Sequence, residues 1–127
     1  MKKEKGQSLI EVLVALAVAI VVVLALVRVT TTSVRNAAFA RNQALATKYA
    51  QETIEKIRAY RDETDWTTFI NNCESPPGLS NLPPPFSRTI TCSGSEDDKR
   101  NILVEVSWVD AHGTHKSELK TRLTNWR

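Results

Sequence analysis

Apolar residues gather near the start of this chain. From Leu9 to Val27 every residue except Glu11 is apolar, which makes a run of 19 positions. At about 1.5 Å per residue, a helix of this run reaches about 28 Å, close to the thickness of a bilayer's hydrocarbon core. The run therefore predicts a helix that is buried in lipid or against other apolar helices.

The next region, from residue 28 to about residue 61, contains no Gly or Pro and is rich in Ala and charged residues. Its apolar residues recur at helical spacing, and Glu52 precedes Lys56 by four positions, the favourable order for an ion pair on a helix. Nothing between Gln7 and Tyr60 breaks a helix, so the pattern predicts one continuous helix. Its second half would have an apolar stripe of Leu45, Tyr49, Ile54, Ile57 and Tyr60.

Turn residues then replace the helical pattern. We expect the long helix to end between Asp62 and Asp65, and Asp65 to be the N-cap of a short second helix. The apolar side of that helix would hold Trp66, Phe69 and Ile70. The five prolines that follow exclude a helix or a central strand and favour stiff extended backbone.

Three segments near the C-terminus have the alternation of β-strands: Ser87–Cys92, Asn101–Asp110 and Thr114–Trp126. His112 and Gly113 are expected in the tight turn between the last two. Such a small sheet buries little core alone, and the second half of the long helix can cover it. The sequence therefore predicts an α+β fold, in which a long N-terminal helix packs against a small antiparallel sheet. The predicted inner face of that sheet consists of Ile102, Val104, Val106, Trp108, Leu119, Thr121 and Leu123.

The formal net charge of +3 lies mostly in the first six residues, where three lysines and one glutamate sum to +2. The remainder sums to only +1, which argues against a general phosphate-binding surface. The stretch Lys116–Arg127 is locally basic and contains Trp126, a composition that is compatible with DNA as a partner. The same residues are typical of the outer face of an edge strand.

Cys73 and Cys92 are the two cysteines, and both follow the apolar run. An even count in a short exported chain favours a disulfide, whereas in a reducing compartment they would be unrelated thiols. His112 and His115 have no third metal ligand nearby, and the acidic run Glu96–Asp98 lacks the order of a calcium loop. There is no phosphate loop and no nucleophile–base motif. The sequence therefore predicts no enzyme, no metal site and no cofactor.

Three interpretations compete for the first 28 residues. A cleaved secretory signal would have the charged start, but this apolar run is too long for one and is interrupted by Glu11. A plain membrane anchor explains the length but leaves Glu11 as a charge that costs about 3 kcal/mol in lipid. The third interpretation comes from a family resemblance.

The segment K-G-Q-S-L-I-E-V-L-V-A-L resembles the class III signal of type IV pilins and of the related pseudopilins of type II secretion. The resemblance implies that a membrane peptidase cuts after Gly6 and methylates the new N-terminus at Gln7. Glu11 is then the fifth mature residue, as in that family, and we expect it to set the register of assembly. Gln7 departs from the usual Phe or Met, which leaves its methylation open. Arg28 stands where many major pilins have a proline that kinks the helix, so this helix is expected to melt less readily there.

The resemblance also implies a ladle-shaped, pilin-like fold and a structural role as a subunit of a type IV pilus-like filament. The segment L-I-E-V-L-V-A-L resembles minor pilins more than major ones, so a minor pilin is the subunit that we expect. The expected partners are other pilin subunits, the prepilin peptidase, the inner-membrane assembly machinery and, before assembly, the lipid bilayer. We expect a single-pass protein of the cell membrane with a cytoplasmic N-terminus, which later joins an extracellular or periplasmic filament. A pseudopilin of a secretion machine and a lone membrane-anchored protein are the alternatives.

This interpretation divides the chain into five parts. They are a leader (1–6), a membrane or filament-core half-helix (7–28), an amphipathic half-helix (29–61), a connecting loop with the Pro-rich stretch and first strand (62–100), and a C-terminal hairpin (101–127).

Overall fold

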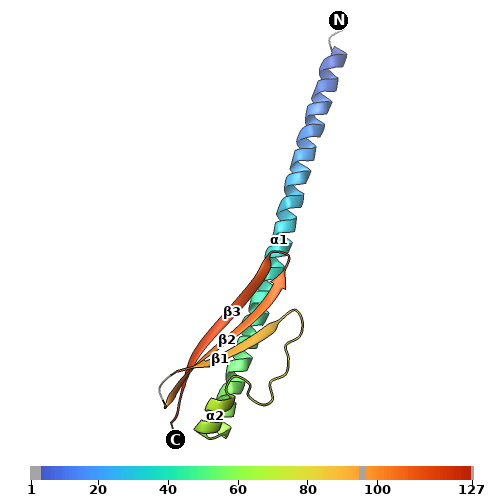
Figure 1. The fold of residues 1–127 in the computed structure, drawn as a ribbon. Helices are drawn as coiled ribbons and strands as arrows, with labels where there is room; N and C mark the ends of the chain where they lie inside the picture. Colours follow the sequence, from blue (N-terminus) through green and yellow to red (C-terminus); the bar gives the residue numbers. More distant parts are fainter. Residues whose placement is uncertain (1–3, 95–96, 127) are drawn as a thin grey trace. The chain divides into compact units, whose positions relative to one another are not determined.

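The computed structural model describes residues 4–94 and 97–126, and of residues 4–7 it describes the backbone alone. Its contacts divide the chain into two units, Met1–Phe39 and Ala40–Arg127. The elements are α1 (Glu4–Glu63), α2 (Trp66–Asn72), β1 (Ser87–Ser93), β2 (Lys99–Asp110) and β3 (Gly113–Thr124) (Figure 1).

The first unit consists of the N-terminal part of α1, which is helical without interruption across Arg28. Its large apolar side chains are exposed, from Leu9 at 64% to Val34 at 65%. Within the part of the chain that the structure describes, this is the one helical stretch that is long and apolar enough to cross a membrane, with a mean hydropathy of 3.2. The predicted helix is confirmed. Three of its hydroxyls donate to the carbonyl four residues earlier: Thr30 to Leu26, Thr31 to Val27 and Thr32 to Arg28.

The second unit contains a three-stranded antiparallel sheet in which β2 lies between β1 and β3. The alternation predicted for β2 is confirmed, because Ile102, Val104, Val106 and Trp108 are each at most 1% exposed. The C-terminal half of α1 covers this face of the sheet (Figure 1). The unit therefore has the α+β, pilin-like arrangement that the sequence predicted.

The helix contributes a stripe of buried residues to this core. Ile54 and Ile57 are buried as predicted, and Leu45, Tyr49 and Tyr60 are half-buried around them. Ala46 and Ala50 are also fully buried, although neither was assigned to the stripe from the sequence. At these two positions a methyl group fills the space between helix and sheet, so larger side chains would have to displace their neighbours.

The segment between α1 and β1 is fixed to the core at several points. Asp65 caps α2 as predicted, since its carboxylate accepts a hydrogen bond from the Thr68 amide at 2.9 Å. Phe69 of α2 is fully buried. The predicted disulfide is confirmed, because Cys73 and Cys92 are joined with their Cα atoms 6.3 Å apart. It links the end of α2 to β1 across the Pro-rich loop.

Two sequence-based expectations are wrong in detail. Glu52 forms its ion pair with Lys48, four positions earlier, at 3.7 Å, and not with Lys56, four positions later. The last strand ends at Thr124 and not at Trp126. Beyond that point the Asn125 amide donates to the Asp98 carbonyl at 2.7 Å, and Trp126 extends past the sheet.

Gly113 begins β3 directly after the β2–β3 turn, close to where the sequence placed it. Its φ angle is +125°, a backbone conformation that residues with a side chain rarely adopt. Nothing lies within 4 Å of the position that a Cβ atom would occupy there. The turn therefore needs glycine for its backbone conformation and not for space.

Candidate processing and assembly site

Glu11 lies on α1 within the first unit, in an apolar stretch of helix. On a helix, residues three and four positions apart are neighbours. Among the described side chains, those neighbours are Ser8, Val14 and Ala15, and none of them has a charge. The helix itself therefore surrounds this carboxylate with groups that cannot neutralise it.

Gly6 and Gln7 lie in the first turns of α1, and the structure describes their backbone as helical. The side chain of Gln7, and the first three residues of the predicted leader, lie outside what the structure describes. The predicted cleavage point therefore falls on the same helix as Glu11, five and four residues before it. The roles of Gly6, Gln7 and Glu11 stay predictions.

Comparison with known proteins identifies this N-terminal segment. Residues 1–27 match the prokaryotic N-terminal methylation motif. The methylation motif is a class III signal peptide typical of type IV pilins and pseudopilins, and it includes Gly6, Gln7 and Glu11. No curated protein and no solved structure shows significant similarity to the chain.

The methylation motif and the long apolar helix together indicate a pilin- or pseudopilin-like subunit. Subunits of this class are typically structural and not enzymatic. The motif implies processing by a prepilin peptidase and assembly with pilin-like subunits. The exposed apolar helix that follows it is consistent with insertion into a membrane before assembly.

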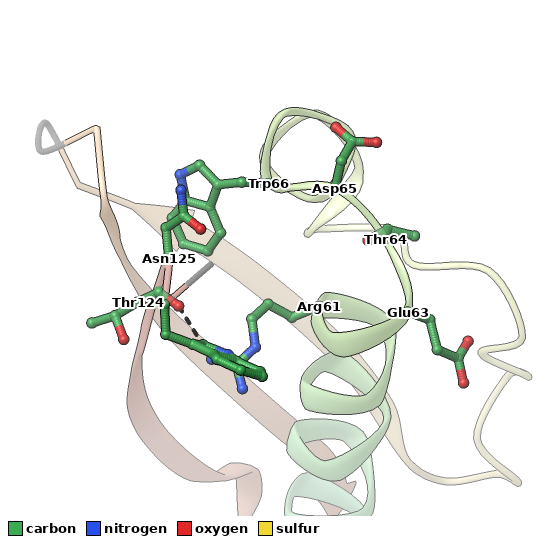
Figure 2. A pocket seen from close by; sticks show the side chains of 8 residues that line it. Arg61, Glu63, Thr64, Asp65, Trp66, Thr124 and Asn125 are labelled. Atoms are coloured by element: carbon green, nitrogen blue, oxygen red, sulfur yellow. Dashed lines mark hydrogen bonds between the residues drawn. The ribbon is translucent and has the colours of Figure 1, made fainter.

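A second candidate site, which was not predicted from the sequence, lies in the second unit where α1 ends. It is a cleft of about 340 Å³ between that helix end and the tail that follows β3 (Figure 2). Trp66 was expected only as part of an apolar helix face, and Trp126 only as part of a basic stretch. The fold brings them to one cleft, lined by Arg61, Glu63, Thr64, Asp65, Trp66, Thr124, Asn125 and Trp126.

Hydrogen bonds hold the walls of this cleft in place. Arg61 donates to the Thr124 carbonyl at 3.2 Å and forms an ion pair with Asp62 at 2.8 Å. The guanidinium of Arg61 lies 5.9 Å from the centre of the Trp126 ring, within the range of a cation–π interaction. The indole N–H of Trp66 donates to the Asp97 carbonyl. Side chains that are far apart in the sequence are thus fixed around one opening.

The predicted turn histidines lie around one carboxylate. Asp110 accepts a hydrogen bond from the His112 amide at 2.7 Å, and its carboxylate is 3.0 Å from His115 Nε2. The bond from the His112 amide is the main cause that lowers the pKa of Asp110. Among the residues that the structure describes, no group of three or more His, Cys, Asp or Glu could hold a metal ion.

The basic C-terminal stretch is partly neutralised by its neighbours on the sheet. Lys116 lies 3.2 Å from Glu105 and 2.6 Å from Glu118, and these bonds raise the pKa of the lysine. Lys120 and Arg122 share the outer face with it, whereas Arg127 lies outside the described part of the chain. Of the predicted acidic run, Asp97 and Asp98 are exposed in a turn, and Glu96 also lies outside that part.

Proposed function

We propose that this chain is a prepilin that is cut between Gly6 and Gln7 and then assembled, as a minor pilin, into a type IV pilus-like filament. One observation carries the proposal. The methylation motif at residues 1–27 begins a long helix whose large apolar side chains are exposed in the structure. A signal that is read by a peptidase and a surface that needs a non-aqueous environment thus occupy the same helix.

The exposed apolar half of α1 needs two successive environments. Before assembly, lipid covers it, since a helix satisfies its own backbone polar groups and can lie in a bilayer. After assembly, the same half-helices of other subunits replace the lipid. Under this proposal residues 7–28 form the membrane or filament-core part, and residues 29–127 remain outside the membrane with residues 29–61 backing the sheet.

Glu11 has a physical role in this scheme. Cleavage frees a cationic amine on Gln7, and a neighbouring subunit that is shifted along the filament axis brings its Glu11 carboxylate to that amine. A buried charge without a partner costs several kcal/mol. When two buried charges are paired, their best-attested benefit is that they fix the register in which the helices pack. Glu11 therefore favours the assembled position over others in which its charge stays unpaired.

Mass spectrometry of the protein from membranes and from sheared filaments tests the processing step. The expected mature chain begins at Gln7, lacks residues 1–6 and has one disulfide, and the same spectrum shows whether Gln7 is methylated. Gly6→Leu is expected to keep the full-length mass. A wild-type chain that keeps residues 1–6 in cells with an active prepilin peptidase would instead support a lone membrane-anchored protein.

A substitution at Glu11 tests the assembly step. Glu11→Ala is expected to be cleaved and to stay in the membrane, but to be lost from filaments at least tenfold, in line with the cost of an unpaired buried charge. Glu52→Ala is the matched control, because Glu52 is an exposed acid on the second half of the same helix. Normal incorporation of Glu11→Ala contradicts the assembly role.

A pseudopilin of a type II secretion-like machine is the runner-up, because it would carry the same motif and helix. Deletion of the gene separates the two: loss of surface fibres supports the pilin, and loss of a secreted protein with no change in fibres supports the pseudopilin.

Binding of DNA by the basic C-terminal stretch is a weaker candidate function. Two carboxylates pair with Lys116 and weaken its attraction for phosphate. Lys120 and Arg122 are then the cations on that face that would contact DNA. A gel shift with the full chain in detergent tests it. Binding that weakens as salt rises supports DNA contact, and absence of salt-sensitive binding rejects it.

A further inference from the structure

The apolar run of α1 is followed by a segment in which every charged residue is a cation. Arg28 comes directly after Val27, the last position of the run, and Arg35 follows seven positions later. Both side chains are exposed. No Asp or Glu occurs between Glu11 and Glu52, so neither arginine has an acidic neighbour at helical spacing. A negative charge that neutralises these two guanidinium groups therefore has to come from outside this stretch of helix.

Helix geometry places the two arginines on one side of α1. Seven positions make nearly two full turns, so Arg28 and Arg35 lie one above the other, about 10 Å apart along the helix axis. A shallow groove of about 470 Å³ lies on the helix surface beside Arg28. Its lining residues are Arg28, Val29, Thr32, Ser33 and Asn36.

The position of Arg28 matches the edge of a bilayer. The run from Leu9 to Val27 reaches about 28 Å as a helix, and the hydrocarbon core is about 30 Å thick. When the run lies in lipid, Arg28 is therefore at the boundary with the headgroups. The headgroup layer is about 5 to 8 Å deep on each side. Because side chains on a helix tilt toward its N-terminus, the long side chain of Arg35 leans back toward this layer.

The hydrogen-bond donors beside this boundary suit a phosphate group. The Thr32 hydroxyl donates to the Arg28 carbonyl at 3.0 Å and so is already used within the helix. The guanidinium groups of Arg28 and Arg35 each have five N–H donors. Ser33 and Asn36 add an exposed hydroxyl and an exposed amide. Positive charge, several donors and no carboxylate are the groups that bind a phosphate, and the planar fork of arginine matches two of its oxygens.

We propose that Arg28 and Arg35 bind the phosphate of an anionic phospholipid, such as phosphatidylglycerol, at the edge of the bilayer. An anionic lipid is preferred over a zwitterionic one, because the ammonium group of the latter already neutralises its phosphate. Each cation near an anionic membrane surface strengthens the attraction by about fivefold. The contact holds the apolar run at a fixed depth before assembly. The inference rests on the proposed function in one respect, which is that the chain lies in a bilayer before it joins a filament.

The next two cations along α1 are less suitable for this contact. Arg41 is 13 positions after Arg28, which is about 20 Å along a helix and beyond the headgroup layer. Lys48 is farther still and forms an ion pair with Glu52 at 3.7 Å. Both side chains are exposed. Arg41 and Lys48 therefore provide a matched control that has the same two charges at a greater distance from the membrane.

Photo-crosslinking to lipid tests the contact. Val29→p-benzoylphenylalanine places the probe in the groove and keeps both arginines. The full chain is reconstituted at low density in vesicles of equal parts phosphatidylglycerol and phosphatidylcholine with the same acyl chains, and mass spectrometry counts the adducts. Adducts of phosphatidylglycerol are expected to exceed those of phosphatidylcholine at least fivefold, and the excess is expected to fall as salt rises. Equal numbers of the two adducts, or adducts mainly with a second copy of the chain, overturn the proposal.

Charge removal in the same probe-bearing chain tests the two arginines. The double substitution Arg28→Gln, Arg35→Gln is expected to reduce the excess to less than twofold. The control, Arg41→Gln with Lys48→Gln, removes the same amount of charge and is expected to leave the excess nearly unchanged. Glutamine is a good helix former, so neither change is expected to break α1. An excess that survives the first pair of substitutions, or that falls equally in the control, overturns the proposal.

The outcomes also separate this inference from the proposed function. If the wild-type chain does not float with vesicles, both fail. If it floats with them but shows no excess of phosphatidylglycerol adducts, the lipid contact alone fails. If the excess is found but the chain is neither cut after Gly6 nor found in filaments in cells, the proposed function alone fails.

Discussion

Arg88 of β1 donates a hydrogen bond from Nη1 to the Thr53 hydroxyl of α1, over 3.2 Å. Its Nη2 donates to the Ser80 carbonyl in the Pro-rich loop, over 2.8 Å. Burial lowers the pKa of the Arg88 guanidinium, since removal from water disfavours the charged form. One side chain thus connects the helix, the sheet and the loop.

Replacement of Arg88 is expected to destabilise the second unit. Arg88→Met keeps part of the aliphatic packing but removes both hydrogen bonds, which predicts a loss of about 1–3 kcal/mol in the free energy of unfolding. Urea unfolding of the full chain in detergent measures this. Lys48→Met, which removes an exposed ion pair on α1, is the control and is expected to cost less than about 0.5 kcal/mol. Equal losses for the two variants would contradict a connecting role for Arg88.

Reduction of the disulfide is expected to weaken the same unit. Cys73 and Cys92 are 19 positions apart, so their bond closes a loop worth about 3 kcal/mol in the chain-entropy model. A reducing agent is therefore expected to lower the urea midpoint of the wild-type chain. The double variant Cys73→Ser, Cys92→Ser is expected to start from the lower midpoint and to be insensitive to the reagent. A wild-type midpoint that does not move on full reduction rejects this account.

Replacement of a buried alanine of α1 by a larger residue is expected to destabilise the second unit. Ala50 is 0% exposed against the sheet, so Ala50→Leu forces neighbours apart at a cost of about 1–3 kcal/mol. Ala59→Leu introduces the same change on the exposed side of the same helix and is expected to be nearly neutral. Thermal unfolding followed by circular dichroism compares the two, and an Ala50→Leu variant as stable as Ala59→Leu would be inconsistent with the close helix–sheet contact.

The cap of α2 is expected to depend on pH. The hydrogen bond from the Thr68 amide is the main cause that lowers the pKa of Asp65 below its usual value of 3.8. A carboxylate with a lowered pKa stabilises the fold above its unfolded pKa, and this contribution is lost as pH falls through the folded pKa. The amide proton of Thr68, followed by NMR, is expected to titrate with a midpoint below 3.8. In Asp65→Asn that titration is expected to disappear, and a wild-type midpoint above 3.8 would contradict the cap's effect.

The sequence predicted those features that depend on local pattern. The alternation around Val104 in β2, the unbroken helix across Arg28 and the cap at Asp65 each follow from neighbours in the chain, and the structure contains all three. The cysteine pair was predicted from its count and expected compartment. These signals are local or compositional, so the features can be predicted without knowledge of the tertiary contacts.

The remaining features depend on which segments meet in space. Ala50 has too little side chain to mark a helix stripe, and only the approach of the sheet shows that it is buried. Glu52 had two possible lysine partners at equal spacing, and the sequence favoured the wrong one. Trp66 and Trp126 line one cleft although 60 positions separate them, which no periodicity in the sequence indicates.

The three threonine hydroxyls that follow the apolar run have a consequence for how a subunit moves. Thr30, Thr31 and Thr32 each bond within α1, at 2.8 to 3.0 Å. They require no hydrogen bond from water, headgroup or neighbour. This stretch of helix can therefore be transferred from a bilayer's edge to the side of another helix without exchanging a single hydroxyl partner. The three hydroxyls make the same hydrogen bonds in both environments. The free energy of moving the subunit from the bilayer into a filament therefore depends on the apolar surface and the charges of the helix.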